Sequence, residues 1–441
     1  MDLPEIIRTC GVVGAGGAGF PTHVKVDTRV DTVVINGVEC EPLLANDRYL
    51  LETRGVSILK GLELIMDSCG ARRGYLAVKQ KYGALILQLQ QLAGTREDIE
   101  VFPVGDFYPA GDEYVLVNEI TGRLVPEGGI PPQAGCLVQN VETTTNIFEA
   151  YQNQTPVTRR HLTCTGEVKE PSIVLSHIGA TLGEVIAVCG GATVDDYVVI
   201  AGGPVMGEVT TDLDSPVTKT TGGILVLPRI HPLVERKMLP LEVLIKRSRT
   251  ACCQCTYCTE LCPRYLLGYQ IQPHRIMRQI IFGLSSAAEI TENAFLCSGC
   301  GLCEMYACVM GISPGMVNAA IKQKLSDEGF KPDFPEREVR VHEMREYRKV
   351  PSDRLVQRLQ LGGYAEKKLS RAPLTGPERV EILLKQHVGA AASPVVRPEQ
   401  QVREGELIAD IPEGCLGGCV HASIEGKVTV VDEQRIIIER A

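Results

Sequence analysis

The sequence predicts a multidomain α/β protein organised around a cysteine-rich module. Three observations support this fold class. Apolar strands alternate with helical segments over the first third of the chain, and β-branched residues dominate the next stretch and return near the C-terminus. Two cysteine runs with fixed spacing lie between Cys252 and Cys308. A chain of 441 residues has room for about three domains.

Composition and charge exclude several classes of function. The net charge of −9 argues against nucleic acid as a binding target. Residues 1–5 lack the basic and apolar regions of a signal peptide, and no stretch approaches about 20 uninterrupted apolar residues. We therefore expect a cytoplasmic protein without a transmembrane segment. Its 17 cysteines, an odd number, fit a reducing compartment better than a disulfide framework.

Residues 1–155 form the first predicted domain. After a short helix at 2–10, the expected elements are strand 32–35, helix 46–68, strand 74–79, helix 82–93, strand 99–103, and helices that begin near 108–113 and 142. Such alternation indicates a layered α/β domain, whose ligands bind at the carboxyl ends of strands. Asn36, Glu39 and Glu41 fall at such an end. They are our first candidate ligand-binding residues.

A glycine-rich loop precedes this sheet. Residues 14–19 satisfy the spacing G-x-G-x-x-G, and Glu39 follows about twenty residues later, as in a dinucleotide-binding fingerprint. However, only two apolar residues precede the loop, and Thr22–Asp27 alternates like a strand instead of opening a helix. We therefore expect a different phosphate cradle, in which bare backbone N–H groups approach a flavin or nucleotide phosphate. A tight structural turn is the alternative.

Residues 156–228 resemble a small β-grasp unit. The predicted elements are strands at 160–166, 172–175 and 197–200, and a helix at 182–189. Two turn-rich loops, Gly202–Gly207 and Lys219–Gly223, could bind a corrin or a dinucleotide, although turns between strands are the simpler interpretation. We interpret His161 and His177 as structural.

The cysteine-rich module, within residues 229–335, carries the most specific motif. The first run reads C-x2-C-x2-C-x3-C-P, and the second reads C-x2-C-x2-C-x4-C with Val309 in place of the proline. The first is the ligand spacing of bacterial [4Fe–4S] ferredoxins, in which the fourth cysteine of each run ligates the other cluster. One cluster is therefore assigned Cys252, Cys255, Cys258 and Cys308. The other is assigned Cys297, Cys300, Cys303 and Cys262.

Two structural zinc sites are the alternative interpretation of these cysteines. Zinc sites pair two C-x2-C units and have no use for a third cysteine at the same interval, so the spacing favours clusters. Cys253 lies between two ligands and is interpreted as a spare thiol. A basic helical connector over residues 229–250 leads into the module.

The chain ends in a linker and a second β-rich domain. Residues 336–377 mix acids and bases at helical spacing, which indicates a solvated linker. Residues 378–441 return to strands and are typical of a lipoyl-like barrel-sandwich hybrid. Lys427 follows a glycine instead of lying between methionines, so we expect a docking module without a modified lysine. His421 is interpreted as structural, with a role toward a cobalt-containing partner as the alternative.

Several of these segments together resemble a known family. They are residues 14–22, 36–48, 108–113 and 139–143. They resemble the FMN-binding fold of the flavoprotein subunit of respiratory complex I and, more closely, the RnfC-type electron-transport proteins. Over the whole chain the similarity is to the cobalamin (corrin) reductases of propanediol-utilisation microcompartments. The resemblance implies an FMN-binding α/β domain, a soluble-ligand-binding β-grasp (SLBB) domain, a helical ferredoxin-like two-cluster domain and a C-terminal barrel-sandwich hybrid.

The resemblance also implies individual binding residues. Those expected around FMN are Gly14, Gly16, Gly17, Lys25, Asn36, Glu39, Tyr108, Glu113 and Asn140. Phe20 and Glu41 match positions at which NADH stacks and binds. Complex I has an acid where Val38 stands in this chain.

The expected chemistry follows from these cofactors. NADH delivers two electrons as hydride, clusters accept one at a time, and a flavin converts between the two. Resemblance implies that cob(III)alamin or cob(II)alamin is the acceptor for coenzyme B12 reactivation, with an adenosyltransferase and microcompartment proteins as partners and a microcompartment lumen as location. The alternatives are an Rnf-like electron-transfer protein or microcompartment shuttle with a protein acceptor, and a cluster-bearing scaffold without a working nucleotide site, which Val38 alone supports.

Overall fold

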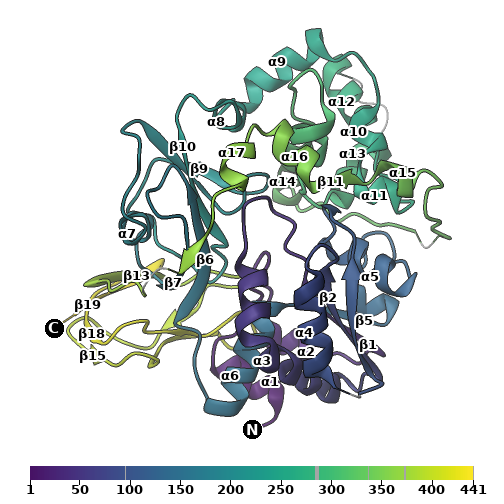
Figure 1. Cartoon of the computed structure of the whole chain (residues 1–441). Coiled ribbons are helices and arrows are strands. Elements are labelled where there is room, and N and C mark those ends of the chain that lie inside the picture. The colour runs from purple at the N-terminus through teal and green to yellow at the C-terminus, as the bar shows by residue number, and fades with distance from the viewer. Residues whose placement is uncertain (95, 284–287, 336, 372–373, 441) are drawn as a thin grey trace.

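The computed structural model describes residues 1–94, 96–283, 288–335, 337–371 and 374–440. The N-terminal α/β layer lies beside a six-stranded sheet, and the cysteine-bearing helices cover one end of both (Figure 1). The C-terminal strands lie at the opposite end, against the six-stranded sheet and the first helices. The domains expected from the sequence therefore meet along shared seams.

The N-terminal domain is built on a parallel sheet in the order β3-β2-β1-β5. Its strands are β1 (Thr32–Gly37), β2 (Arg73–Lys79), β3 (Ile99–Val104) and β5 (Cys136–Asn140). Its helices are α1 (Leu3–Thr9), α2 (Thr22–Val26), α3 (Asn46–Cys69), α4 (Gly83–Ala93), α5 (Glu113–Thr121) and α6 (Val141–Asn153). A short strand, β4 (Phe107–Tyr108), precedes α5. The expected alternation of strands and helices is confirmed.

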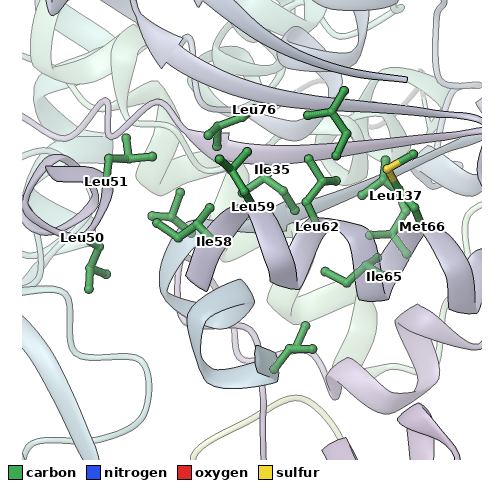
Figure 2. Packing of buried hydrophobic residues seen from close by; sticks show 14 of the residues in the cluster. Ile35, Leu50, Leu51, Ile58, Leu59, Leu62, Ile65, Met66, Leu76 and Leu137 are labelled. Atoms are coloured by element: carbon green, nitrogen blue, oxygen red, sulfur yellow. The ribbon is translucent and has the colours of Figure 1, made fainter. Parts of the chain in front are cut away.

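The core of this domain lies under helix α3. Ile58, Leu62 and Ile65 recur at helical spacing and are fully buried against the sheet that carries Ile35 and Leu76 (Figure 2). Burying one such side chain stabilises the fold by roughly 1.5–3 kcal/mol. This packing fixes the sheet whose carboxyl edge carries the candidate ligands.

One expected element is wrong. The sequence pattern predicts a strand over residues 22–27, but Thr22–Val26 form helix α2. Thr22 and Val26 are buried while Val24 is exposed, so the apolar period is four residues and not two. Five residues are too few for the sequence to separate these periods. The glycine loop nevertheless differs from a dinucleotide fingerprint, because β1 comes after the loop and Val13 forms only an isolated bridge before it.

The β-grasp domain contributes most of the six-stranded sheet, in the order β12-β7-β6-β10-β8-β9. Its strands are β6 (Arg159–Gly166), β7 (Ser172–His177), β8 (Tyr197–Ala201), β9 (Glu208–Thr210) and β10 (Gly223–Pro228). Helix α7 (Leu182–Val188) begins at Thr181, which forms a capping box with Glu184. The edge strand β12 (Ser370–Arg371) comes from the linker.

Short helices surround the cysteines. They are α8 (Pro232–Lys237), α9 (Leu241–Ala251), α10 (Tyr257–Glu260), α11 (Pro263–Leu266), α12 (Pro273–Phe282), α13 (Ala288–Glu292), η2 (Asn293–Leu296), η3 (Cys303–Ala307) and α14 (Pro314–Asp327). No helix among the described residues is both long and apolar enough to span a bilayer.

The linker is not the solvated segment that the sequence indicated. Its described residues form α15 (Arg345–Arg348), β11 (Val350–Pro351), α16 (Ser352–Arg358), α17 (Gly362–Ala365) and β12. Strand β11 pairs antiparallel with β4, and Leu355, Leu359 and Leu361 are buried in a core shared with the cysteine module. The sequence did not predict this apolar face, because only a few leucines and valines mark it among many charged residues.

The C-terminal domain is the expected barrel-sandwich hybrid. Its sheets have the orders β13-β19-β18-β15 and β14-β16-β17. The strands are β13 (Arg379–Leu383), β14 (Ser393–Pro394), β15 (Gln401–Val402), β16 (Leu407–Asp410), β17 (Val420–His421), β18 (Gly426–Val431) and β19 (Arg435–Glu439).

Candidate functional site

The structure gathers the eight motif cysteines into two groups. The outer group lines a cavity of about 100 Å³ and consists of Cys252, Cys255, Cys258 and Cys308. The inner group lines a cavity of about 550 Å³ and consists of Cys262, Cys297, Cys300 and Cys303. These are the memberships expected for two [4Fe–4S] clusters, including the exchange of the fourth cysteine. Four thiols around one cavity fit the donor set that a cubane cluster requires.

Each cysteine run is bent by backbone in the left-handed region. In the first loop Gln254 and Thr256 have φ of 54° and 66°. In the second, Gly299 and Gly301 supply φ of 72° and 69° without steric cost. These turns curve each run around the cavity that its cysteines line. Cys253 is exposed and does not share the buried setting of Cys262 and Cys303.

Burial raises the pKa of thiols in both groups. Desolvation and neighbouring thiols raise the pKa of Cys258 to about 12, and desolvation raises the pKa of Cys262 to about 12. Because the thiolate is the ligand, assembly of a cluster must release the thiol protons.

The inner group lies directly against the α/β domain. The hydroxyl of Tyr108, which is fully buried, donates to the carbonyl oxygen of Cys300 at 2.6 Å. The guanidinium of Arg264 binds Asp112 at 2.9 Å, and Asp112 in turn caps helix α5. The inner cluster site and the first domain are therefore held together by two buried polar contacts.

The glycine loop folds back on itself at the edge of the sheet. The Gly14 amide donates to the Phe20 carbonyl oxygen at 2.9 Å. A Cβ on Gly16 would lie 2.9 Å from Nδ2 of Asn140, whereas Gly17 has no neighbouring atom within 4 Å. The backbone thus approaches the Asn140 side chain on one side and is open on another, which fits a phosphate cradle.

Two asparagines end adjacent strands at this edge. Asn36 of β1 and Asn140 of β5 face each other in the parallel register. The Asn36 side chain donates to the Gly111 carbonyl at 2.9 Å and accepts from the Val38 amide at 3.0 Å. Asn140 caps α6 through the Glu142 amide and donates to Asp47 at 3.1 Å. These two residues, both expected around FMN, thus lie at the same edge of the sheet, and the carbonyl of Val38 packs closely on Gly111.

Buried carboxyl groups surround these asparagines. Glu39 accepts from the Asp47 amide at 3.1 Å, and burial and the Asp47 charge raise the pKa of Glu39 well above its usual value. Burial also raises the pKa of Asp47 to about 7. Glu142 differs: burial acts to raise its pKa, but Arg160, 3.6 Å away, and hydrogen bonds from His161 together lower it.

Asp47, Lys79 and Arg160 were missed by the sequence analysis. Asp47 resembled an ordinary first-turn acid, and Arg160 belongs to the next domain. Lys79 ends the buried strand β2 and binds Asp106 at 3.1 Å. Its position at the carboxyl end of an apolar strand was the signal from which the sequence could have identified Lys79.

Lys25 and Glu113 form an ion pair across the domain. Their side chains, on helices α2 and α5, lie 2.9 Å apart. Both were expected near the flavin, and the structure brings them to each other.

Glu41 has a contact that its expected role did not include. Its two oxygens accept from the amides of Val205 and Met206, each at 2.9 Å, and Tyr108 lies 3.4 Å away. A Cβ on Gly203 would overlap the Glu41 carboxylate. Phe20 is 40% exposed on the glycine loop, and no hydrogen bond or ring contact among the described residues joins it to Glu41. The turn-rich loop at 202–207 therefore docks on Glu41.

The loop at 219–223 joins three domains. Lys219 is buried and donates to the carbonyls of Gly11 and Cys419, each at 2.7 Å. Burial lowers the pKa of Lys219 to about 8. Arg160 donates to the carbonyl of Ala15 within the glycine loop at 2.8 Å. The C-terminal and β-grasp domains thus both support the cradle.

Comparison with known proteins supports the same architecture. Family models match residues 7–149 (Nuo51 FMN-binding domain), 162–209 (SLBB domain), 251–313 (4Fe-4S dicluster domain) and 365–440 (RnfC barrel sandwich hybrid domain). The chain is 41% identical to cobalamin reductase PduS of Salmonella typhimurium, over all of this chain and 96% of that protein. The chain belongs to the PduS cobalamin reductase family. Citrobacter freundii PduS is also 41% identical, over 97% of its length.

More distant relatives match this PduS family member over only part of its length. A component of the Na⁺-translocating ferredoxin:NAD⁺ oxidoreductase complex of Acetobacterium woodii is 35% identical, over 60% of this chain and 58% of that protein. A solved NAD⁺-reducing [NiFe]-hydrogenase shares the fold, with a TM-score of 0.51 and 21% identity; the alignment covers 75% of this chain and 62% of that one.

Proposed function

We propose that this chain is an NADH-dependent cobalamin reductase. One observation carries the proposal: the chain matches proteins named cobalamin reductase over its whole length. The geometry supports it, because an FMN-type cradle, two four-cysteine cavities and their connecting contacts occur in one chain. When bound, FMN accepts hydride and releases single electrons, and the clusters carry single electrons.

The residues that would hold these groups follow from the site. The open backbone at Gly17, next to the Gly16 contact with Asn140, would face the FMN phosphate. Lys25, paired with Glu113, would supply positive charge, and the side chains of Asn36 and Asn140 would contribute from the strand ends. The inner and outer cysteine groups would each hold one [4Fe–4S] cluster. Phe20, exposed on the loop, would stack on NADH, and Glu41 would line the approach while anchoring the 202–207 loop.

The order of the two clusters follows from the contacts of Tyr108. Its hydroxyl ties the inner group to the α/β domain, while the outer group lies in a separate cavity farther along the helical module. We therefore assign the inner site to electron entry and the outer site to electron exit. The protein supplies positions and a dry environment, and no side chain needs to act as an acid or base in the electron transfer.

The product of the reaction also indicates where the protein works. Cob(I)alamin is a strong nucleophile that water and oxygen destroy, so it needs a nearby adenosyltransferase to convert it to coenzyme B12. We accordingly place the protein with an adenosyltransferase and shell proteins in the lumen of a microcompartment. Copurification of these proteins with the intact chain would test that placement.

The decisive experiment follows spectra under strict exclusion of oxygen. The protein, reconstituted with FMN and iron–sulfur clusters, is mixed with NADH and hydroxocobalamin, with a Cys303→Ser variant and free FMN as controls. Free FMN is essential, because loose reduced flavin itself reduces cobalamin. The proposal expects cob(II)alamin to form faster than in both controls. Bleaching of the clusters without cobalamin reduction beyond the controls would instead assign the acceptor to a protein.

A second candidate function is electron transfer to another protein. The similarity to the Acetobacterium woodii protein favours it, since that protein is named as part of a ferredoxin:NAD⁺ oxidoreductase complex. The experiment above separates the two candidates.

A further inference from the structure

A large open groove lies where the linker returns against the cysteine module. Its volume is about 910 Å³, near the upper end of the usual range for small-molecule sites. One wall comes from α10 and η3 of the cysteine module, and the other from α15, β11 and α16 of the linker. We call it the tyrosine groove, after Tyr257, Tyr306 and Tyr347 in its lining.

The groove combines aromatic faces with an excess of positive charge. Tyr347 is 82% exposed and Tyr257 is 49% exposed, so both rings are available to a ligand. Four basic residues line the groove against two carboxylates, Glu260 and Asp353, although the whole chain is acidic. Those four are Arg348, Lys349, Arg354 and Arg358.

Three of these four basic side chains already bind partners within the protein. Arg348 binds Glu260 at 2.6 Å across the groove, and Lys349 binds Glu119 at 2.9 Å. Arg358 donates to the carbonyl of Cys308 at 3.3 Å. Arg354 differs: it is exposed, and within the described part of the chain it has neither an ion pair nor a hydrogen bond. It is the cation most available to a ligand.

The groove lies beside the exit cluster site. Tyr257 precedes Cys258 in the sequence, and Ala307 and Val309 flank Cys308, all three in the groove lining. Cys258 and Cys308 belong to the outer group. A molecule seated in the groove would therefore be separated from the outer cluster by little more than the cysteine loops.

We propose that the tyrosine groove seats the corrinoid acceptor, with its corrin plane against tyrosine rings and its nucleotide-loop phosphodiester at Arg354. This inference rests on the proposed function. A corrinoid has a broad flat body and one phosphodiester anion, and the groove offers aromatic faces and one unpaired cation. In each step one electron leaves the outer cluster for cobalt: first Co(III) becomes Co(II), and the bound hydroxide leaves as water with a proton from solvent. A second electron gives Co(I), and NADH supplies both.

The test measures binding independently of turnover. Equilibrium dialysis of the reconstituted protein against hydroxocobalamin compares Tyr347→Ser and Arg354→Ser with wild type. Tyr151→Ser, at a ring 49% exposed outside the groove, and Arg403→Ser, at an exposed arginine of the C-terminal domain, are matched controls. We expect each groove variant to weaken binding about fivefold to tenfold, and the controls to bind as wild type does.

Cobinamide, which lacks the nucleotide loop and its phosphodiester, identifies the role of Arg354. The wild type should bind cobinamide more weakly than hydroxocobalamin, and Arg354→Ser should abolish that preference while Tyr347→Ser retains it. Iron content and the visible spectrum verify that both clusters are present in every variant.

The outcomes separate this proposal from the proposed function. If the wild type reduces hydroxocobalamin and both groove variants bind and reduce it as the controls do, the groove is not the corrinoid site, although the function stands. If the wild type reduces none beyond free FMN, the function itself fails. If the variants lose binding and reduction together while NADH still bleaches the clusters, the groove is the exit site.

Discussion

At the scale of single residues, Tyr108 connects the flavin-type domain to the inner cysteine loop. The resemblance placed it beside FMN, and the structure places its hydroxyl on the Cys300 carbonyl, with Glu41 3.4 Å away. Burial raises the pKa of Tyr108 well above its usual value, so the hydroxyl remains a donor at any physiological pH.

We expect Tyr108→Phe to slow electron entry into the clusters. The substitution leaves the partly buried Cys300 carbonyl without its donor, which costs about 1–2 kcal/mol and loosens the inner loop. Stopped-flow bleaching of the clusters by NADH should slow several-fold while iron content stays unchanged. Tyr75→Phe, at a half-buried tyrosine of β2, is the control. Equal rates in the two variants would remove Tyr108 from the electron path.

The buried carboxyl groups predict a pH dependence. Asp47 has a pKa of about 7 in the fold against about 4 when unfolded, so the native state retains a proton that the unfolded chain has released in that range. Its contribution to stability is complete below pH 4 and is lost as the pH rises to 7.

In the wild type, the thermal midpoint should therefore fall as the pH rises from 5 to 7.5. Asp47→Asn should make this fall smaller. Over the full pKa shift, ionisation of Asp47 lowers the wild-type free energy of unfolding by at most about 4 kcal/mol. Asp67→Asn, at an exposed position on the same helix, should retain the wild-type slope. The same slope in the Asp47 variant would mean that this carboxyl does not titrate in that range.

At the scale of elements, the returning linker decides how the domains are joined. Strand β11 pairs with β4, so Val350 lies opposite the same Tyr108 that binds Cys300. The carboxylate of Glu119 on α5 binds both Arg345 and Lys349 of the linker. Glu119 is the buried counter-charge of the buried Arg345, whose other carboxylate partner, Glu346, is exposed.

Glu119→Gln should open this segment locally. Loss of the charge leaves Arg345 with only the exposed carboxylate of Glu346, 3.0 Å away, and we expect a cost of about 1–2 kcal/mol, equivalent to roughly tenfold more frequent opening. Trypsin cleavage after Arg345, Arg348 and Lys349, followed by mass spectrometry, measures it. Glu343→Gln, an exposed acid of the same segment, should be cleaved at the wild-type rate. Unaltered cleavage of the Glu119 variant would show that strand pairing alone holds the linker.

At the scale of the whole molecule, the C-terminal domain completes the flavin-type cradle. Val388 donates to the Gly19 carbonyl at 3.3 Å, and Gly418 packs on Val13. Lys219 joins the same region to Gly11 and Cys419. The barrel-sandwich hybrid therefore packs behind the glycine loop.

Lys219→Met should therefore weaken FMN binding from a distance. Two buried carbonyls lose their donor at about 1–3 kcal/mol each, which frees the glycine loop to move. Titration of the protein into FMN, read by quenching of flavin fluorescence, should show a dissociation constant about tenfold higher than wild type. Lys385→Met, at an exposed lysine near the same seam, is the matched control. Unchanged affinity would make the C-terminal domain irrelevant to the cradle.

Local pattern determined much of this protein from the sequence alone. Cysteine intervals specify which thiols can share a cavity, and alternating apolar strands and helices specify the layered domain, because both depend on residues close together in the chain. The two cavities are lined by the cysteines that these intervals group together, and strands β1, β2 and β3 lie in the expected segments.

Only the tertiary structure decided what lies at the seams between domains. The docking of Glu41, the bridge made by Lys219, the support from Arg160 and the fold of the linker all join residues far apart in sequence. Their side chains are hydrophilic and look solvated in the sequence. They become informative only when burial removes water and each must find a polar partner, because a buried charge or donor without one is costly.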